Sequence, residues 1–147
     1  MPAPGVIQAE DYDLGGEGIA YHDTTPGNQG FNDYREGDVD LGNAKNPRIG
    51  QTKPGEWIEY TVYARKGGFF ALTALAGNAN DNPGTFKITV DAREIKQPVQ
   101  VPSTGSCGKF ERVTTKPFSL NRGSHIIRIT IGKPISLDRL IIEPHVE

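Results

Sequence analysis

The chain has 147 residues and a net charge of −2 at pH 7, and its 18 glycines and 11 prolines indicate many turns rather than long helices. Its length suits one domain with a hydrophobic core, so we expect a single domain over residues 1–147, with a start or linker remnant at residues 1–5. No apolar run approaches the roughly 20 residues of a membrane helix, no basic stripe indicates nucleic-acid binding, and the one cysteine, Cys107, excludes an internal disulfide.

Short strand patterns recur along the chain, beginning with brief candidates at residues 5–10, 19–22 and 39–41. The first long pattern, at residues 57–63, alternates in a way that predicts a half-buried strand. A Gly-Gly turn then leads into an apolar strand at residues 69–76. The two faces of the 57–63 strand carry Ile58, Tyr60 and Val62 on one side and Trp57, Glu59, Thr61 and Tyr63 on the other.

The second half of the chain repeats the pattern. Residues 85–91 alternate with Phe86, Ile88 and Val90 inward, after a loop at residues 78–84. No window of eleven or more residues shows the spacing of an uninterrupted amphipathic helix. The sequence therefore predicts an all-β protein, a β-sandwich of the jelly-roll type. The remaining strands are expected at residues 97–101, 110–113, 125–131 and 137–142, with a tight turn at 121–123.

Motifs for catalysis are lacking. Neither GxSxG nor HExxH occurs, and 18 acidic residues make a chance pair of carboxylates uninformative. Cys107 lies in a Gly/Ser-rich stretch without a paired histidine, which indicates an incidental thiol. The three histidines, His22, His125 and His145, have no ligand-like spacing, and we expect them to be solvated at the surface. We do not expect an enzyme.

Side chains with oxygen atoms near both ends of the chain indicate a possible calcium site. Gln8 and Glu10 share a face of the first strand, and Asp138 lies on a late strand that should run beside it. Calcium takes six to eight oxygen ligands, often including backbone carbonyls of the kind that residues 24–30 could supply. The alternative interpretation is an exposed acidic strand edge.

Several segments together resemble the family 6 carbohydrate-binding modules. They span nearly the whole chain in the family's order, and the related family 35 modules share much of the pattern. Residues 20–41 are similar to a longer-looped subgroup attached to polysaccharide-degrading enzymes. The matching segments are Ile7–Tyr12, Gly55–Val62, Val101–Gly105, Ser124–Arg128 and Leu137–Ile142.

The resemblance implies a jelly roll of the galactose-binding-like type that binds sugar chains without catalysis. It also implies a structural Ca²⁺ held by Gln8, Glu10, Asp138 and loop carbonyls. Such modules are appended to secreted glycoside hydrolases. We therefore expect a carbohydrate ligand, no nucleic-acid or membrane partner, and a monomeric unit tethered to a catalytic domain. The location expected is outside the cell or on its surface, as part of a larger bacterial enzyme.

The chain departs from the family at its usual loop-end sugar site. Gln51, Cys107 and Ser136 stand where the resemblance would place two aromatic residues and an asparagine. Aromatic faces supply much of the apolar contact area at a sugar ring, so this site should be weakened. Gln51 and Ser136 nevertheless remain candidate ligand residues. A structural or protein-interaction β-sandwich that has lost sugar binding is therefore the alternative function.

Two other places offer compensating side chains. Tyr34 could stack on a sugar and Arg35 could bond to its hydroxyls or to a uronate carboxylate, or both could simply brace the calcium loop. Trp57, which shares a face with Glu59 and Tyr63, matches a tryptophan that some family members use on the concave sheet face. The alternative for Trp57 is packing beneath the opposite loop.

Overall fold

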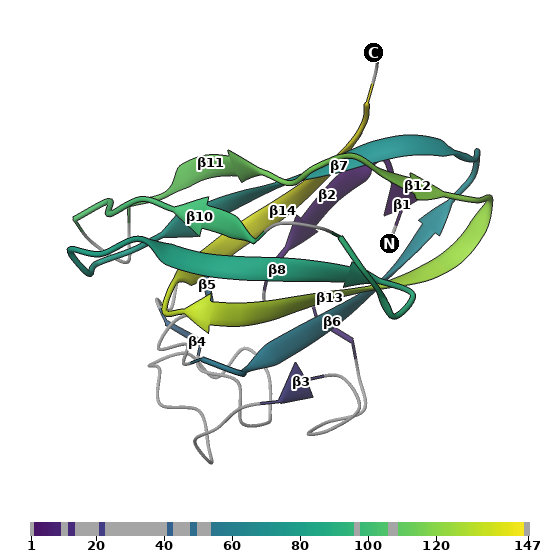
Figure 1. Ribbon diagram of the computed structural model, residues 1–147. Coiled ribbons are helices and arrows are strands. Elements are labelled where there is room, and N and C mark those ends of the chain that lie inside the picture. Colours follow the sequence, from purple (N-terminus) through teal and green to yellow (C-terminus); the bar gives the residue numbers. More distant parts are fainter. Residues whose placement is uncertain are drawn as a thin grey trace.

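The protein folds as two β-sheets packed face to face (Figure 1). The computed structural model describes residues 2–9, 12–13, 21–22, 41–42, 48–49, 54–95, 98–105 and 109–145. Every regular element in these residues is a strand, which confirms the predicted all-β sandwich. The strands are β1 (Pro2–Ala3), β2 (Gly5–Gln8), β3 (Tyr21–His22), β4 (Leu41–Gly42), β5 (Arg48–Ile49), β6 (Trp57–Ala64), β7 (Gly68–Gly77), β8 (Gly84–Val90), β9 (Arg93–Glu94), β10 (Val99–Val101), β11 (Glu111–Thr114), β12 (Phe118–Leu120), β13 (Gly123–Lys133) and β14 (Ser136–Pro144).

One sheet, the β6 sheet, has the order β1-β6-β13-β8-β10, with β3 also paired to β6 and β9 to β8. Strand β13 runs antiparallel to both β6 and β8, so it forms the centre of the sheet. Burial along β6 alternates as the sequence predicted: Ile58, Tyr60 and Val62 are buried, while the opposite face is open or half-buried. The β6 sheet therefore has an inner face toward the core and an outer face toward solvent.

The second sheet, the β7 sheet, has the order β11-β7-β14-β5-β4, with β12 also paired to β7 and β2 to β14. Its centre is the long antiparallel pair β7–β14. The register shifts between Leu137 and Arg139, which leaves Asp138 as the extra residue of a β-bulge. Bulges re-aim side chains and are frequent beside functional sites.

The core fills the space between the inner faces of the two sheets. Phe86, Ile88 and Val90 are buried as predicted, facing residues such as Leu72 and Leu140 from the β7 sheet. The Tyr60 hydroxyl also finds a partner there, because it donates to the Ala9 carbonyl oxygen at 2.5 Å. Its bond ties the first strand segment to β6, 51 residues later in the chain.

The turns follow the Gly/Pro punctuation, with one exception. The 78–84 loop joins β7 to β8 as predicted, and the buried Asn78 side chain organises it by donating to the carbonyls of Asn82 and Val101. Asp91 and Ala92 form the two-residue turn between β8 and β9 with positive φ angles of 50° and 67°. No helix in the described part of the chain is long and apolar enough to cross a membrane.

Candidate functional site

A stacked cluster of three side chains lies on the outer face of the β6 sheet. Antiparallel register places Arg128 of β13 opposite Glu59 and Thr130 opposite Trp57, so these outward side chains are neighbours. The Arg128 guanidinium carbon lies 3.8 Å from the centre of the Trp57 ring. Its Nε donates to Glu59 Oε2 at 2.7 Å. One face of the tryptophan ring is therefore occupied by a cation that is itself held by a carboxylate.

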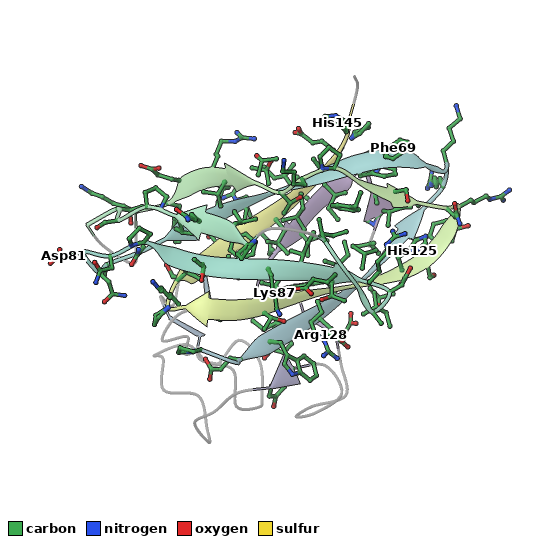
Figure 2. The ribbon with its side chains drawn as sticks, in the orientation of Figure 1. Phe69, Asp81, Lys87, His125, Arg128 and His145 are labelled. Atoms are coloured by element: carbon green, nitrogen blue, oxygen red, sulfur yellow. The ribbon has the colours of Figure 1, made fainter. Side chains whose placement is uncertain are left out.

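The same outer face continues along β6 and β13 with exposed apolar side chains. Tyr63 is 43% exposed and Ile126 is 45% exposed, and the register sets Ile126 opposite Thr61. A cavity of about 370 Å³ lies beside Arg128, and it is lined by Glu59, Thr89, Asp91, Ala92, Ile126 and Arg128. Figure 2 labels Arg128 and Lys87, which lie on this side of the molecule. The face thus combines ring surface, hydroxyl groups and a paired arginine.

Two ion pairs lie on this outer face, and the carboxylate of Asp13 accepts hydrogen bonds from the backbone amide and the hydroxyl of Thr61. Arg128 pairs with Glu59, and Lys87 Nζ lies 3.2 Å from Glu94 Oε1. Sugar rings present hydroxyl groups that accept and donate hydrogen bonds, and a paired charge still offers such bonds without presenting a net field. The electrostatics of the face therefore suit a neutral ligand.

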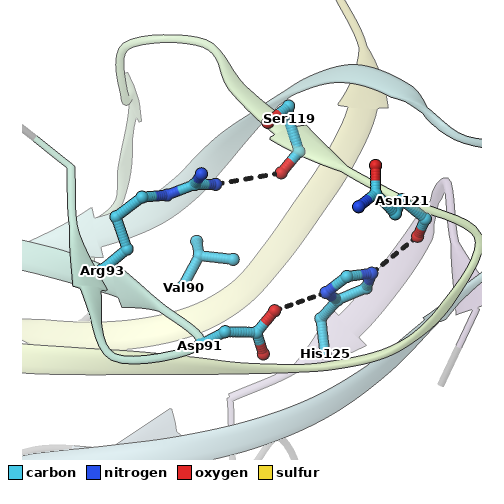
Figure 3. A pocket seen from close by; sticks show the side chains of 6 residues that line it. All are labelled: Val90, Asp91, Arg93, Ser119, Asn121 and His125. Carbon is cyan, nitrogen blue, oxygen red and sulfur yellow. Dashed lines mark hydrogen bonds and ion pairs between the residues drawn. The ribbon is translucent and has the colours of Figure 1, made fainter.

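A second polar cluster lies where the β8–β9 turn meets the start of β13 and the end of β12 (Figure 3). His125 Nδ1 lies 2.5 Å from Asp91 Oδ2, and its Nε2 lies 2.6 Å from the Asn121 carbonyl oxygen. Arg93 donates from Nη2 to the Ser119 carbonyl at 3.3 Å, which links the two sheets. These residues and Val90 line a cavity of about 270 Å³. The expectation of a solvated His125 is wrong, since only 12% of its side chain is exposed.

Both ring nitrogens of His125 face atoms that only accept hydrogen bonds. An ionised carboxylate and a carbonyl oxygen have no proton to give, and a neutral imidazole donates from only one nitrogen, so this arrangement stabilises the charged form, which donates from both. The hydrogen bond to Asp91 raises the pKa of His125, against the effect of burial. Burial acts to raise the pKa of Asp91, but the bonds from His125 and the Ile126 amide outweigh it and lower that pKa.

The residues predicted for calcium are only partly within the described chain. Strand β2 pairs with β14 so that Gln8 lies opposite Arg139, and the Ala9 amide donates to the Asp138 carbonyl at 3.0 Å. The Asp138 side chain is 15% exposed, with Arg139 Nε 3.0 Å from its Oδ2. Among the described residues there is no group of three or more His, Cys, Asp or Glu suited to a metal, and Glu10 lies outside them. Gln8 and Asp138 nonetheless offer oxygen atoms from adjoining strands, a donor chemistry that fits Ca²⁺.

The loop-end candidates have a different outcome. Ser136 is fully buried at the start of β14, where it pairs with Gly77, and its side chain offers no surface to a sugar in this structure. Its role in ligand binding stays a prediction that this burial does not favour. The candidate Gln51, the compensating pair Tyr34 and Arg35, and Cys107, which stands at the family's second aromatic position, lie outside the described residues.

Sequence reasoning missed two features of these sites. The sequence placed Arg128 in a strand and in a segment that resembles the family, without a contact. Its diagonal contact with Trp57, 71 residues earlier, depends on the β6–β13 register, which pairs Arg128 with Glu59. The only available signal was the outward phase of both residues under period-2 alternation. The contact between His125 and Asp91 spans 34 residues and carries no local motif.

Comparisons with known proteins identify the family. The family model "Carbohydrate binding module (family 6)" matches residues 8–143. None of the curated proteins compared with the chain matches it. Three similar solved structures match 97–98% of this chain. A family 6 module of Clostridium stercorarium, in complex with cellobiose, has 17% sequence identity and a TM-score of 0.73, and the match covers 96% of that chain. Module CBM6cm-2 of Cellvibrio mixtus lichenase 5A, in complex with cellotriose, has 17% identity, a TM-score of 0.67 and 98% of its chain covered, and a family 35 module of Clostridium thermocellum has 21% identity, a TM-score of 0.67 and 99% covered. The chain is a member of the family 6 carbohydrate-binding modules, a family of sugar-binding domains.

Proposed function

We propose that this module binds a neutral polysaccharide along the outer face of the β6 sheet, with Trp57, Tyr63 and Ile126 as its apolar contacts. The observation that carries the proposal is the row of exposed or half-buried apolar groups on two adjacent strands, beside the charge-paired Arg128 and Glu59. Sugar rings bind where an aromatic face meets a few fixed hydrogen-bonding groups. The outer face has both.

Arg128 gives this site a defined chemistry. It covers one face of the Trp57 ring, so that face is closed to stacking and a sugar there meets the guanidinium instead. The guanidinium keeps donors that Glu59 does not use, because Arg has five N–H groups and the Glu59 contact engages one of them here. These donors would bond to sugar hydroxyls, with Thr89 at the rim of the adjacent cavity as a further partner.

The test is affinity electrophoresis of the purified module in gels that contain β-glucan, xylan or other neutral polysaccharides. We expect retardation by at least one neutral polymer, and a loss of retardation in Tyr63→Ala. Tyr63 is exposed, so this substitution leaves the core intact. Phe69→Ala removes an exposed ring of the β7 sheet, 61% exposed against 43% for Tyr63, and serves as the control for the neutral polymers. Absence of retardation in every gel, together with no glycan-array signal, would overturn the proposal.

The calcium ion belongs to the same proposal. Gln8 and Asp138 lie on paired strands of the β7 sheet and offer an amide and a carboxylate oxygen, and Glu10, two residues after Gln8 in the sequence, is the third ligand of the proposal. When bound, Ca²⁺ would neutralise these carboxylates and join the N-terminal strand to β14. Its contribution is to stability rather than to sugar contact, since Asp138 lies in the β7 sheet and the apolar row lies on the β6 sheet.

The wider setting is also a proposal: a monomeric, non-catalytic module that targets an attached glycoside hydrolase outside the cell or at its surface. Its support is the family itself and the Cellvibrio mixtus relative, which is a module of a lichenase. The sequence flanking the module in its gene tests this setting, and a catalytic glycoside hydrolase domain is the expected neighbour. A flanking region without any catalytic domain would contradict it.

The alternative function is a β-sandwich that has kept the fold and lost sugar binding. The burial of Ser136 and the arginine that covers Trp57 favour it, because both reduce the surface open to a sugar. The two functions predict opposite outcomes in the gel experiment.

A further inference from the structure

A third cavity lies at the end of the sandwich where β1, the β6–β7 turn and the end of β14 meet. It has a volume of about 580 Å³, larger than the cavities beside Arg128 and His125. In the β6–β7 turn its lining begins at Arg65, two residues after Tyr63 and just beyond the end of β6, and roughly 26 Å along the strand from Trp57, counting eight residues at about 3.3 Å each. Its lining residues are Pro2, Ala3, Pro4, Arg65, Lys66, Gly67, Gly68, Phe69, Phe70 and Pro144.

The charge in this cavity is of one sign. Arg65 and Lys66 are its charged residues, both are exposed, and no carboxylate is among the residues that line it. Neither cation forms an ion pair with a described residue, whereas Lys87, Arg128 and Arg139 each pair with a carboxylate. The protein as a whole carries a net charge of −2, so this is a local excess of positive charge. The exposed N–H groups of Arg65 and Lys66 can therefore donate to an anionic ligand.

The apolar part of the cavity offers one exposed aromatic ring on which a ligand ring can stack. Phe69 is 61% exposed, more than any other large apolar side chain of the described residues. Figure 2 shows it beside His145 and away from Arg128, and the His145 amide donates to the Phe69 carbonyl at 2.8 Å. At Gly68 a Cβ atom would meet nothing within 4 Å, so a ligand can approach the backbone there. The ring and the cations are separated by two glycines along the chain.

We propose that this cavity is a second sugar site, for an acidic sugar residue whose ring stacks on Phe69 while its carboxylate or sulfate pairs with Arg65 and Lys66. A guanidinium binds a planar carboxylate through two parallel hydrogen bonds, and an ammonium adds a point charge. The inference rests on the proposed function in one respect, that the module binds polysaccharide. It differs in place and in ligand, since the cations of the outer face, Arg128 and Lys87, are held in ion pairs, whereas Arg65 and Lys66 form none with a described residue.

The experiment compares acidic and neutral polymers in affinity gels. Polygalacturonate tests a carboxylate, and dextran sulfate tests a sulfate. Esterified pectin and dextran are their neutral counterparts. We expect one acidic polymer to retard the module and its neutral counterpart not to do so. Both Phe69→Ala and the pair Arg65→Gln and Lys66→Gln should weaken that binding about tenfold, as expected for a charge-assisted contact. Added salt should weaken it as well.

Two controls separate a site from general charge. The pair Lys109→Gln and Arg112→Gln removes the same charge from exposed positions that line none of the three cavities. It should leave the binding unchanged, and so should Trp57→Ala. Equal losses in both charge pairs, loss in Trp57→Ala, or no acidic retardation at all would overturn the inference. If the module forms a dimer and Phe69→Ala abolishes that dimer, the cavity is a contact with a second copy of the chain, and the inference is overturned as well. Retardation by neutral polymers alone would leave the proposed function standing, whereas no retardation by any polymer would remove both.

Discussion

Arg128 stacks on the face of Trp57, with its guanidinium carbon 3.8 Å from the ring centre and its Nε bonded to Glu59. This relationship fixes the chemistry of the outer face of the β6 sheet. It holds the tryptophan ring in one orientation, cancels the charge of Glu59, and closes one ring face to a ligand. The β6–β13 register brings these residues together, because it pairs Arg128 with Glu59 and Thr130 with Trp57.

The stability of the protein depends on the ion pair between Glu59 and Arg128. Only 13% of the Glu59 side chain is exposed, so Arg128→Ala would leave a largely buried carboxylate without its ion-pair partner. We expect this substitution to lower the free energy of unfolding by about 1–3 kcal/mol. Adding Glu59→Gln should restore part of the loss, because a neutral amide costs less to desolvate. Urea unfolding of the three variants measures this, and a double variant no more stable than Arg128→Ala would contradict it.

Stability should depend on pH through the His125–Asp91 pair. Because the folded state raises the pKa of His125 above its ordinary 6.5, the stabilisation is complete below about pH 6.5 and is lost as the pH rises through the folded value. Because it lowers the pKa of Asp91 below 3.8, that contribution is present above pH 3.8 and is lost as the pH falls through the folded value. The melting temperature should therefore be highest between these limits.

Asp91→Asn isolates the effect. Asparagine still accepts from the Ile126 amide, which bonds to Oδ1 at 2.8 Å, and it tolerates the positive φ of 50°. It should flatten the fall in melting temperature above pH 6.5. The amplitude should be at most about 1 kcal/mol, since the Asp91 side chain is 49% exposed and solvent screens the pair. An unchanged pH profile in Asp91→Asn, with His145→Gln as control, would contradict this assignment.

The β8–β9 turn offers a stabilising substitution. Ala92 has a φ of 67°, a left-handed conformation in which a Cβ is strained and which glycine adopts freely. Two-residue hairpin turns with positive φ at both positions favour Asp-Gly, the pair that Ala92→Gly would create after Asp91. We expect a gain of about 0.5–1 kcal/mol in the free energy of unfolding. A lower melting temperature in this variant would show that the turn is not strained.

Calcium should appear as a ligand-dependent stability. Removal of the ion with EDTA should lower the melting temperature, and added Ca²⁺ should restore it. The corresponding gain in the free energy of unfolding is about 2.7 kcal/mol when calcium is at 100 times its dissociation constant. Asp138→Asn should weaken the response, while Glu143→Gln on the same strand, at an exposed position, should not. A melting temperature that is the same with EDTA and with Ca²⁺ would contradict the site.

Much of the fold could be predicted from the sequence because alternation is a local signal. The strand around Phe86 was predicted with its correct inward face, and the strand around Tyr60 with the correct division of its side chains between two faces, since each alternates over at least five residues. For the strand at residues 125–131 only its existence was predicted. Strand β12 was missed because Phe118–Leu120 is only three residues long and follows a proline. Short edge strands carry too few residues to show a period.

The site was less predictable, because its contacts depend on strand register. Trp57 was predicted as a ligand residue from its face and from family resemblance, but nothing local to it indicates that Arg128 covers its ring. The same holds for His125, which was predicted to be solvated and instead bridges Asp91 and Asn121. Local sequence specifies which way a side chain points, whereas pairing between distant strands specifies what it meets.

The most direct test of the central claim uses the fact that Trp57 is the only tryptophan of the chain. Its indole N–H gives a single, unambiguous cross-peak in a ¹⁵N–¹H spectrum. Titration with cellohexaose or with xylohexaose should shift this peak in a saturable manner if the outer face of the β6 sheet holds the sugar, and Tyr63→Ala should weaken the response. Saturable shifts in backbone amides elsewhere, with the indole peak unmoved, would show that sugar binds at another site and would contradict the account.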